Sequence, residues 1–546
     1  MNRNIIVTRN SPPAALDTEH VGHIKGAFGT IAHGDTAARR GLSAKLKTLL
    51  AIVGPGLIVM VGDNDAGAFG TYTQAGQNYG THLLWTLLLL VPVLYVNQEM
   101  VLRLGAVSGV GHARLILERF GKFWGAFSVI DLFILNALTI VTEFIGVTLA
   151  AGYLGLPKVP SVVLAAVLIV AAASTGSFRR FERICMTLVL GSLVVVPIFL
   201  MAHPPAGQIA HDFVVPGLPK GGQLSTVMLL IIGIVGTTVA PWQLFFQQSY
   251  VIDKRITPRF VNYERVDLWI GIVIVVVGAA AMFCFSAAAF GGTPLAGKFT
   301  DAGGVAAGLG HYVSHLAGIL FAIGLLDASV IGAAAVGLAT AYAGADVIGV
   351  NHSLHRSVGR AKGFYACYAA LMGIAAALVV IPGVPLGLIT EGVQTLAGVL
   401  LPSATVFLLL LCNDKDVLGP WVNGKFSNVF TSVVVCALVL LSIVLTASVL
   451  FPAITGGQIV VILAVGAVLG VAIGLYVIGL SRRKAESRLT VPVEWYDRDS
   501  WRMPALNLLA RPVVSTQRKV GLLVLRAYLF LAFALVVAKI VSVAVR

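Results

Sequence analysis

Two aspartates, Asp63 and Asp65, stand among small residues in the stretch VGDNDAGAFG, with apolar runs on either side. Gly62 and Gly67 weaken a helix at this point, and the side chains of the two acids and of Asn64 compete for backbone hydrogen bonds. The stretch therefore predicts a helix that breaks in its middle. Buried carboxylates at such a break are typical of a binding site or a watery cavity; the alternative is that one aspartate only caps a half-helix.

A second interruption is predicted in the stretch GIVGTTVAPWQLFFQQSY. Pro241 removes a backbone hydrogen bond and crowds the preceding turn, while Gly236 loosens the helix before it. Each interrupted segment is the first of a set of five, so the pattern predicts a five-plus-five inverted repeat. Transporters built from inverted repeats form their binding site from two discontinuous helices that meet near the middle of the membrane.

The elements that must position these residues are membrane helices. The chain has 546 residues, of which 58% are hydrophobic and only 11% are charged, and its apolar runs of about 20 residues match the thickness of a bilayer. The sequence therefore predicts an all-α polytopic protein in a lipid bilayer. The expected apolar segments are 48–80, 82–104, 123–153, 160–177, 184–203, 226–250, 267–290, 312–348, 364–381, 386–411, 427–451, 458–480 and 520–544.

Lys and Arg residues are distributed unevenly over the connections between these segments. The net charge is +14, but the connections that follow odd-numbered segments carry only Lys158, Lys220 and Lys298. By the positive-inside rule, the basic side, together with the N-terminus, is cytoplasmic. We therefore expect a multi-pass protein of the plasma (inner) membrane, and we expect no nucleic-acid partner in spite of the positive charge.

Composition divides the chain into five parts. Residues 1–46 are polar and lack periodicity, which predicts a disordered, basic cytoplasmic tail without a signal peptide. Residues 47–425 are expected to form a ten-helix transport core, and residues 426–480 are expected to add helices 11 and 12. Residues 481–519 are expected to be a cytoplasmic linker, and residues 520–546 a last segment whose crossing of the membrane stays open. The oligomeric state also stays open, a monomer included.

The stretch GPGLIVMVGDNDAGAFGTYTQAG, residues 54–76, resembles the first-helix signature of the NRAMP (natural-resistance-associated macrophage protein) divalent-metal transporters. It has DAGA at 65–68 where the usual motif is Asp-Pro-Gly-Asn. The second, third and tenth helices of the family resemble three further stretches, residues 98–121, 142–146 and 393–419. The resemblance covers roughly residues 45–425. It implies a LeuT-like five-plus-five fold with discontinuous helices 1 and 6 and two or three extra C-terminal helices.

The resemblance also implies an ion site. Asp65 matches the direct carboxylate ligand, the backbone carbonyl of Thr237 is expected to face the ion, and Gln394 matches a tenth-helix Gln near the site. Gln243, at the position of a family Asn, is expected to contact the ion or its water. No cofactor is expected, since the divalent cation is the transported substrate. The residues expected to line the site or to lie behind its ligands are Asp63, Asn64, Ala68, Ala240 and Trp242; Asp63 matches no family ligand, so a helix cap and a supporting role both stay open for it.

Departures from the family pattern bear on the identity of the ion. Manganese and iron transporters of the family carry Met-Pro-His in the sixth helix, whereas this chain has Ala240, Pro241 and Trp242, and Ala68 replaces the first-helix Asn. A thioether favours transition metals, while Mg²⁺ prefers carboxylates, carbonyls and retained waters. The chain therefore resembles the NRAMP-related magnesium transporter branch, and we expect uptake of Mg²⁺ and also of Mn²⁺.

Two groups are missing from the route that protons take in proton-coupled relatives. The third-helix motif of those relatives has an Asp three residues before its Glu, and this chain has Ile140 before Glu143. The sixth-helix His is Trp242, whose indole cannot accept a proton. Glu143 is thus the only family-matched proton carrier, with no evident relay to Asp65. We therefore expect metal transport that is not coupled to protons.

The sequence also bears on three functions other than uncoupled metal uptake. An enzyme is not expected, because the outer loops are short and carry no catalytic constellation. A proton-coupled Mn²⁺/Fe²⁺ symporter of the same family is the main alternative. A Na⁺-coupled amino-acid symporter of the same fold is a further alternative, because unwound helices can also hold Na⁺ and a carboxylate.

Overall fold

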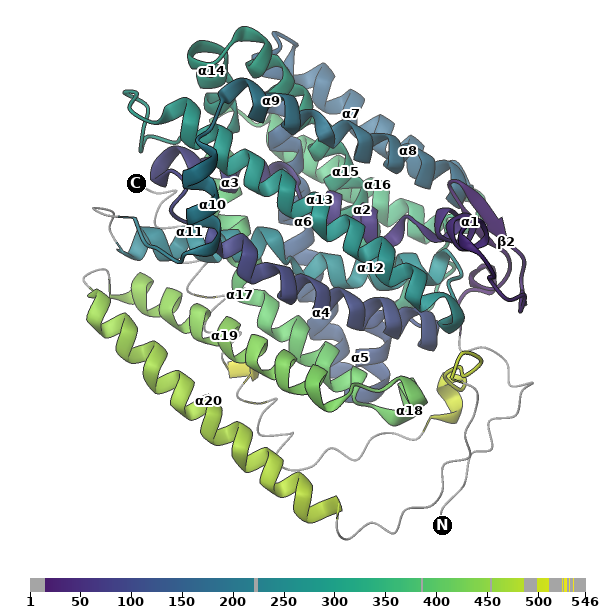
Figure 1. The fold of residues 1–546 in the computed structure, drawn as a ribbon. Helices are drawn as coiled ribbons and strands as arrows, with labels where there is room; N and C mark the ends of the chain where they lie inside the picture. Colours follow the sequence, from purple (N-terminus) through teal and green to yellow (C-terminus); the bar gives the residue numbers. More distant parts are fainter. Residues whose placement is uncertain are drawn as a thin grey trace.

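The architecture comes from a computed structural model of the chain, which describes residues 15–219, 224–383, 386–451, 454–485 and 498–509, together with 523, 525–527, 530 and 534. The described chain is mostly helical, as its apolar composition requires, because a helix satisfies its own backbone hydrogen bonds inside lipid. Figure 1 shows the helices packed into one bundle, with α19 and α20 along one edge.

The first half of the bundle contains the first predicted helix break. Helix α2 ends at Val61 and helix α3 begins at Ala66, so the break falls on the predicted residues. A further bend of 54° separates α1 from α2. The helices of this half are α1 (Leu42–Ile52), α2 (Pro55–Val61), α3 (Ala66–Tyr79), α4 (Trp85–Ser108), α5 (His112–Phe120), α6 (Lys122–Tyr153), α7 (Lys158–Ala173), α8 (Phe178–Gly191), the 3-10 turn η2 (Ser192–Val194) and α9 (Val195–Ala202).

The second half contains the second predicted break. Helix α11 ends at Thr238, and α12 begins at Pro241 after Ala240, whose backbone is extended. A short helix, α10 (Ala206–Val214), precedes this half. Its other elements are α11 (Leu224–Thr238), α12 (Pro241–Asp253), η3 (Pro258–Phe260), α13 (Val261–Phe290), α14 (Ala302–Tyr312), α15 (His315–Ile348), η4 (Val358–Arg360), α16 (Lys362–Val380) and α17 (Leu386–Cys412).

The elements after α17 lie at one edge of the bundle. Helix α19 packs against α17 and α11, and α20 packs against α19. Among the residues of the predicted linker, 498–509 are described: Met503 N–H donates to the Val107 carbonyl at 3.3 Å, so this part contacts α4. The elements are α18 (Lys415–Leu418), η5 (Gly419–Trp421), α19 (Lys425–Leu450), α20 (Gly456–Ala485) and η6 (Leu506–Leu508).

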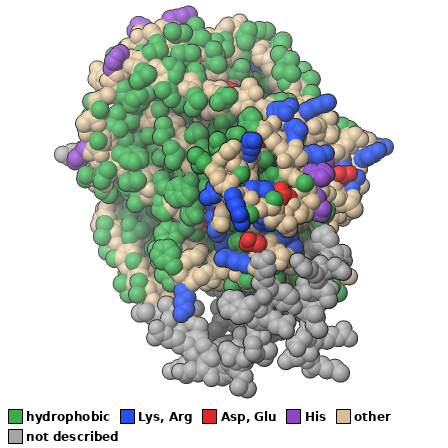
Figure 2. Space-filling view, turned by 45° about the vertical axis from the view of Figure 1, so that its right-hand side comes forward, with side chains coloured by type: hydrophobic (Ala, Val, Ile, Leu, Met, Phe, Trp, Pro, Cys, Tyr) green, Lys and Arg blue, Asp and Glu red, His purple; other side chains and the backbone are tan. Residues whose placement is uncertain are grey.

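Nine helices of the described chain are long and apolar enough to cross a membrane, or ten if the bent α1 and α2 pair counts as one span. Helix α7 is shorter than predicted, and the predicted segment 520–544 lies almost entirely outside the described residues. Figure 2 shows a broad apolar face, with Lys and Arg side chains gathered at one end of it. That pattern fits a protein whose apolar surface faces lipid and whose charged end faces water.

The two halves interlock around the breaks. Helix α13 packs along α2 and α3, and helix α15 packs along α6; within the second half, helix α11 packs along α17. Small residues permit the closest approach: a Cβ on Gly332 of α15 would lie 2.7 Å from Glu143 Oε2 and 2.9 Å from Asp65 Cβ. Gly332 therefore lets α6 and the first break meet.

The N-terminal segment differs from the predicted disordered tail over residues 1–46. Its described part contains the 3-10 helix η1 (Thr18–His20) and an antiparallel hairpin of β1 (Ile24–Gly26) and β2 (Gly29–Ile31), in which Ile24 pairs with Ile31. We call residues 15–31 the strap. Its buried residues include Asp17, His20, Ile24, Ala27 and Ile31. Contacts with distant residues order the strap, and such contacts leave no periodic signal in the sequence.

A pair of opposite charges holds the bend between α1 and α2. Lys254 Nζ donates to the carbonyls of Ile52 at 2.6 Å and Val53 at 2.8 Å, at the C-terminal end of α1. Asp267 Oδ2 accepts from the Gly54 N–H at 3.1 Å and the Gly56 N–H at 2.7 Å, at the N-terminal end of α2. Each charge thus faces the helix end of opposite polarity.

This bend also joins the strap to the rest of the bundle through Glu182 of α8. Glu182 Oε1 pairs with Lys254 Nζ at 2.6 Å, and Glu182 Oε2 accepts from the Ala27 N–H of the strap at 2.5 Å. Both charged side chains are fully buried. Gly54 has φ of +153°, and a Cβ there would overlap Glu182 Oε1, so only glycine fits this bend.

Candidate functional site

The first helix break is built around Asp65. Its Oδ1 accepts a hydrogen bond from the Ala68 N–H at 2.9 Å, so this aspartate does cap α3. A Cβ on Gly67 would overlap the Gln394 amide and would lie 3.1 Å from Asp65 Oδ1, which places Gln394 of α17 beside the carboxylate. Asp65 and Gln394 are each only 3% exposed. Two of the predicted ion ligands therefore lie together.

Glu143 of α6 lies against the same break. Its Oε2 accepts from the Ala66 N–H at 3.1 Å, and a Cβ on Gly332 would lie 2.7 Å from Glu143 Oε2 and 2.9 Å from Asp65 Cβ, so the two acids are close neighbours. The sequence shows no evident relay between these two acids; in the structure Glu143 binds the backbone directly beside Asp65. The third-helix motif shows only the local spacing along α6. The close approach of Glu143 to the first break depends on Gly332 of α15, which has no side chain between them.

Asp63 lies on the other side of the break, toward α12. It is fully buried, and its Oδ1 accepts a hydrogen bond from Gln243 Nε2. Gln98 of α4 orients that amide, because Gln98 Nε2 donates to Gln243 Oε1 at 2.8 Å. Asp63 Oδ2 has no hydrogen-bond partner within the described chain. Asp63 does not cap either half-helix, since Gly62 is the C-cap of α2 and Asp65 caps α3.

The second break faces the first. Tyr72 of α3 and Thr238 of α11 share a hydrogen bond of 2.7 Å between their hydroxyl groups. Gly236 touches the backbone of α17 so closely that a Cβ there would overlap the Gln394 carbonyl. Thr237 is 2% exposed, and its hydroxyl has no partner among the described residues. The two breaks and α17 therefore converge on one buried region.

The remaining predicted site residues lie around this region, but not all of their side chains face it. Asn64 Nδ2 donates to the Val275 carbonyl of α13 at 3.1 Å, so its side chain faces α13. Trp242 is fully buried, and its indole lies 3.7 Å from the position that a Cβ on Gly62 would take. Ala68 and Ala240 are buried at the starts of α3 and α12.

Two residues of this region escaped the sequence prediction. Gln98 fixes the amide that contacts Asp63, and Tyr72 bridges the two breaks. Gln98 is the first residue of the stretch that resembles the second helix of the family, and this resemblance was the signal that could have identified it. Tyr72 carried no signal, because a buried tyrosine in an apolar helix is an ordinary core residue.

The chemistry that this region can offer is that of oxygen ligands. It contains the carboxyl groups of Asp63, Asp65 and Glu143, the amides of Gln243 and Gln394, and the carbonyls at the end of α11. Within the described ranges, no group of three or more His, Cys, Asp and Glu side chains has a metal-holding geometry. A cation held here would therefore need carboxylate, amide and carbonyl oxygens together with water.

A narrow pocket reaches the first break from the end of the bundle that is opposite to the strap. It touches Ala66, whose N–H binds Glu143, and it continues to the start of α14 and to the first turns of α17. Its lining includes Ala66, Thr71, Gln74, Thr142, Asp301 and Glu391. Polar side chains thus mark a route from that end to the break.

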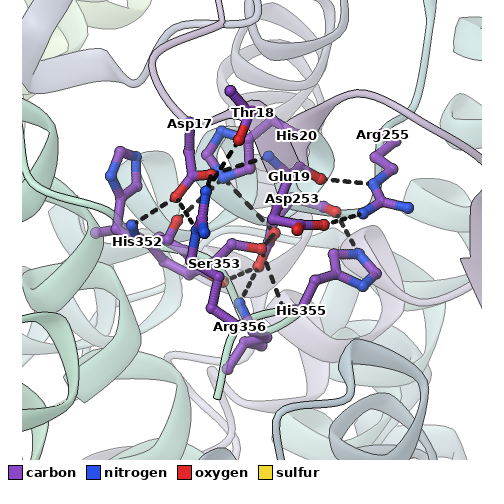
Figure 3. A network of polar contacts seen from close by, with 12 residues as sticks. Asp17, Thr18, Glu19, His20, Asp253, Arg255, His352, Ser353, His355 and Arg356 are labelled. Carbon is purple, nitrogen blue, oxygen red and sulfur yellow. Dashed lines mark hydrogen bonds and ion pairs between the residues drawn. The ribbon is translucent and has the colours of Figure 1, made fainter. Parts of the chain in front are cut away.

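Polar contacts join the strap to the end of α12 and to residues 352–356, as Figure 3 shows. Arg356 Nη2 pairs with Asp17 Oδ1 at 2.6 Å, and the His352 N–H donates to Asp17 Oδ2 at 2.8 Å. Asp253, the last residue of α12, accepts hydrogen bonds from Tyr342 at 2.5 Å and from the Leu354 N–H at 2.8 Å. The strap, the loop 349–357 and the end of α12 are therefore joined in one network.

Two histidines in this network titrate differently. Burial acts to lower the pKa of His352, but the Asp346 carboxylate, at 2.7 Å from His352 Nε2, outweighs it and raises the pKa from 6.5 to about 9. Burial lowers the pKa of His20 below 6.5, so His20 is neutral near neutral pH and its contact with the His352 carbonyl, at 3.0 Å, is a neutral hydrogen bond.

The strap is expected to loosen in alkali. Because the pKa of His352 is raised, the stabilisation from its ion pair with Asp346 is complete below pH 6.5 and is lost as the pH rises through about 9. We expect hydrogen exchange of residues 15–31, corrected for the intrinsic rate, to accelerate about tenfold or more between about pH 7 and about pH 10. His352→Gln should abolish this pH dependence, and His355→Gln should keep it. An unchanged exchange rate in the wild type would contradict the role of His352.

Comparisons with known proteins bear on both the fold and the site. A family model described as "Nramp: Natural resistance-associated macrophage protein-like" matches residues 56–448. The crystal structure of the Eremococcus coleocola manganese transporter, in complex with an aromatic bis-isothiourea substituted compound, is similar with a TM-score of 0.61 and 22% identity, over 82% of this chain and 98% of that one. This likeness confirms the predicted fold class of a helical membrane protein with two discontinuous helices.

Three curated relatives carry the description "Divalent metal cation transporter MntH". The protein from Latilactobacillus sakei is 29% identical over 51% of this chain and 64% of its own length. The protein from Burkholderia ambifaria is 31% identical over 54% of this chain and 68% of its own length. The protein from Bacillus subtilis is 27% identical over 73% of this chain and 92% of its own length. The chain thus spans about two thirds of the first two relatives and nearly all of the third.

Proposed function

The chain belongs to the Nramp family, and from that premise we propose that it is a secondary transporter that takes up divalent metal ions across a membrane. One observation carries the proposal: Asp65, at the break between α2 and α3, lies beside Gln394 and opposite the break between α11 and α12. A buried carboxylate between two interrupted helices suits a dehydrating cation. We further propose that the ion contacts Asp65, Gln394, Gln243 and the Thr237 carbonyl.

The proposed cargo is Mn²⁺, with Mg²⁺ as the second candidate. The relatives are described as a divalent metal cation transporter and a manganese transporter, which favours the manganese alternative over the magnesium expectation. Mg²⁺ stays a candidate because Ala240 leaves no thioether at the second break, and oxygen ligands accept both ions. Uptake into proteoliposomes, measured with Mn²⁺ and Mg²⁺ in parallel, tests the proposal. Failure to carry either ion would overturn it.

Ala240→Met is expected to shift selectivity toward soft metals. A thioether at the start of α12 adds a ligand that favours Cd²⁺ and Mn²⁺ over Mg²⁺. We expect the ratio of KM for Mg²⁺ to KM for Cd²⁺ to rise about tenfold, which corresponds to about 1.4 kcal/mol. Ala240→Leu is the matched control, because it adds similar volume without sulfur. Equal changes in the two variants would show that bulk, and not the thioether, alters selectivity.

Glu143 is proposed as the proton-accepting partner of Asp65. Its Oε2 binds the Ala66 N–H directly beside Asp65, so a cation that reaches Asp65 would favour release of a proton from this pair of neighbouring acids. This contact supports the proton-coupled alternative over the expectation of uncoupled transport. In proteoliposomes that contain a pH-sensitive dye, wild-type uptake should acidify the lumen, and Glu143→Gln should abolish acidification. Acidification that persists in Glu143→Gln would overturn the role of Glu143, and uptake without acidification in the wild type would restore the uncoupled expectation.

The proposed orientation places the strap in the cytoplasm of a plasma (inner) membrane protein. The positive-inside rule supports it, because the Lys and Arg side chains gather at one end of the apolar face. The pocket that touches Ala66 would then open outward, and the strap would cover the inner end. Labelling of a cysteine introduced at Lys25, in right-side-out and inverted vesicles, tests this orientation.

A further inference from the structure

Asp63 is a fully buried acid without a positive partner in the described chain. It lies at the first break, two residues before Asp65, and none of the ion pairs among described residues includes it. An ionised carboxylate that is buried without a counter-charge destabilises the folded state. Such a residue therefore requires an explanation beyond packing.

A structural role does not account for the charge of Asp63. Among the described residues its side chain has one hydrogen bond, from Gln243 Nε2, and the side-chain oxygen of an asparagine would accept that bond equally well. It caps neither α2 nor α3. The fold uses the shape and the acceptor of this side chain, but it does not use the negative charge.

The surroundings of Asp63 connect it to the region where the breaks meet. Gln243 Nε2, which donates to Asp63 Oδ1, also lies 3.4 Å from the Thr238 carbonyl at the end of α11. The amide is held in this orientation by Gln98. Asp63 Oδ2 is buried and has no partner within the described residues, so one carboxylate oxygen remains for a ligand.

We propose that Asp63 is a second carboxylate of the cation site and that it determines selectivity for hard divalent cations. This inference rests on the proposed transport function. Asp63 and Asp65 together neutralise the two charges of the ion, and Asp63 takes the place of the soft ligand that Ala240 lacks. Carboxylate, carbonyl and water oxygens suit Mg²⁺ and Mn²⁺, whereas Cd²⁺ gains more from sulfur.

The test compares Asp63→Asn with wild type and with Asp327→Asn in proteoliposomes. Asp327 of α15 is a matched control, because it is another membrane acid with an unpartnered oxygen in the described structure, and its carboxyl group faces Gly191 of α8. We expect Asp63→Asn to raise KM for Mg²⁺ and Mn²⁺ about tenfold or more, and to raise KM for Cd²⁺ about threefold or less. Asp327→Asn should leave all three values near those of the wild type.

Thermal unfolding separates an effect of the substitution on metal binding from an effect on folding. Without metal, Asp63→Asn should unfold at the same temperature as the wild type or at a higher one, because a buried charge has been removed. The stabilisation by Mn²⁺ should be smaller than in the wild type. Asp63→Ser serves as a second neutral variant if the first does not fold.

The outcomes separate this inference from the function on which it rests. Wild-type transport with unchanged KM and unchanged metal selectivity in Asp63→Asn would overturn the role of Asp63 alone. An equal loss for Mg²⁺, Mn²⁺ and Cd²⁺ would overturn the claim that Asp63 sets selectivity. A wild-type protein that neither binds nor carries divalent metals would overturn the proposed function, and this inference with it.

Discussion

Asp65→Asn is expected to reduce divalent-metal uptake to background while the protein stays folded. The substitution keeps the volume of the side chain, and the amide oxygen can still accept the hydrogen bond from Ala68 that caps α3. The negative charge that offsets the dehydration of the cation is lost, however. Uptake of Mn²⁺ and Mg²⁺ into proteoliposomes measures the effect, with size-exclusion profiles and melting temperature as measures of folding.

Asp131→Asn provides the control for Asp65→Asn, because Asp131 lies near the start of α6, about three helical turns before Glu143. Its uptake should stay close to that of the wild type. Substantial uptake by Asp65→Asn would remove Asp65 from the proposed site. If Asp65→Asn also lost its folded profile, Asp65→Glu, which keeps the charge, would test the ligand role by its change in KM.

Lys254→Met is expected to cause the largest loss of stability among single substitutions in this protein. Lys254 is the one buried cation in the described cluster with Glu182, Glu264 and Asp267, and all four residues are fully buried. Removing one partner of a buried ion pair costs about 3–5 kcal/mol, because the remaining charge is left uncompensated. The carbonyl groups of Ile52 and Val53, at the C-terminal end of α1, also lose their hydrogen-bond donor.

The melting temperature of the purified protein measures this loss. Glu182→Gln should be milder, since it removes one excess negative charge and keeps a hydrogen-bond acceptor for Lys254. The double variant Lys254→Met/Glu182→Gln should be more stable than the sum of the two single effects predicts. A melting temperature of Lys254→Met equal to that of the wild type would show that the ion pair of Lys254 and Glu182 contributes nothing to the stability of the fold.

Local sequence signals predicted both helix breaks. Gly62, Asp63 and Asp65 interrupt the first helix, and Pro241 interrupts the second, because these residues disturb backbone hydrogen bonding wherever they stand. The meeting of Asp65 with Gln394 needed more than local signals. It followed from the family resemblance, since no spacing in one chain tells which helices will touch.

The contacts that escaped prediction join residues far apart in the sequence. Glu182 meets Lys254 across 72 positions, and Asp17 meets Arg356 across 339 positions. The strap was predicted to be disordered because its composition is polar, yet polar residues are what tie it to the loop 349–357. Compositional rules describe the hydrophobic driving force, and they do not register order that comes from specific ion pairs and hydrogen bonds.

The strap also has a consequence for how transport could be controlled. It precedes the matched family region, which begins at residue 56, and it is continuous through α1 with the half-helix α2 that leads to the site. Linkage requires reciprocity: if strap closure and cation occupancy affect each other, each changes the equilibrium of the other by the same factor. A molecule that holds the strap down would thereby change the apparent affinity for the cation without touching the site. Under that condition the strap would be an allosteric input that lies before the part of the chain matched by the family model.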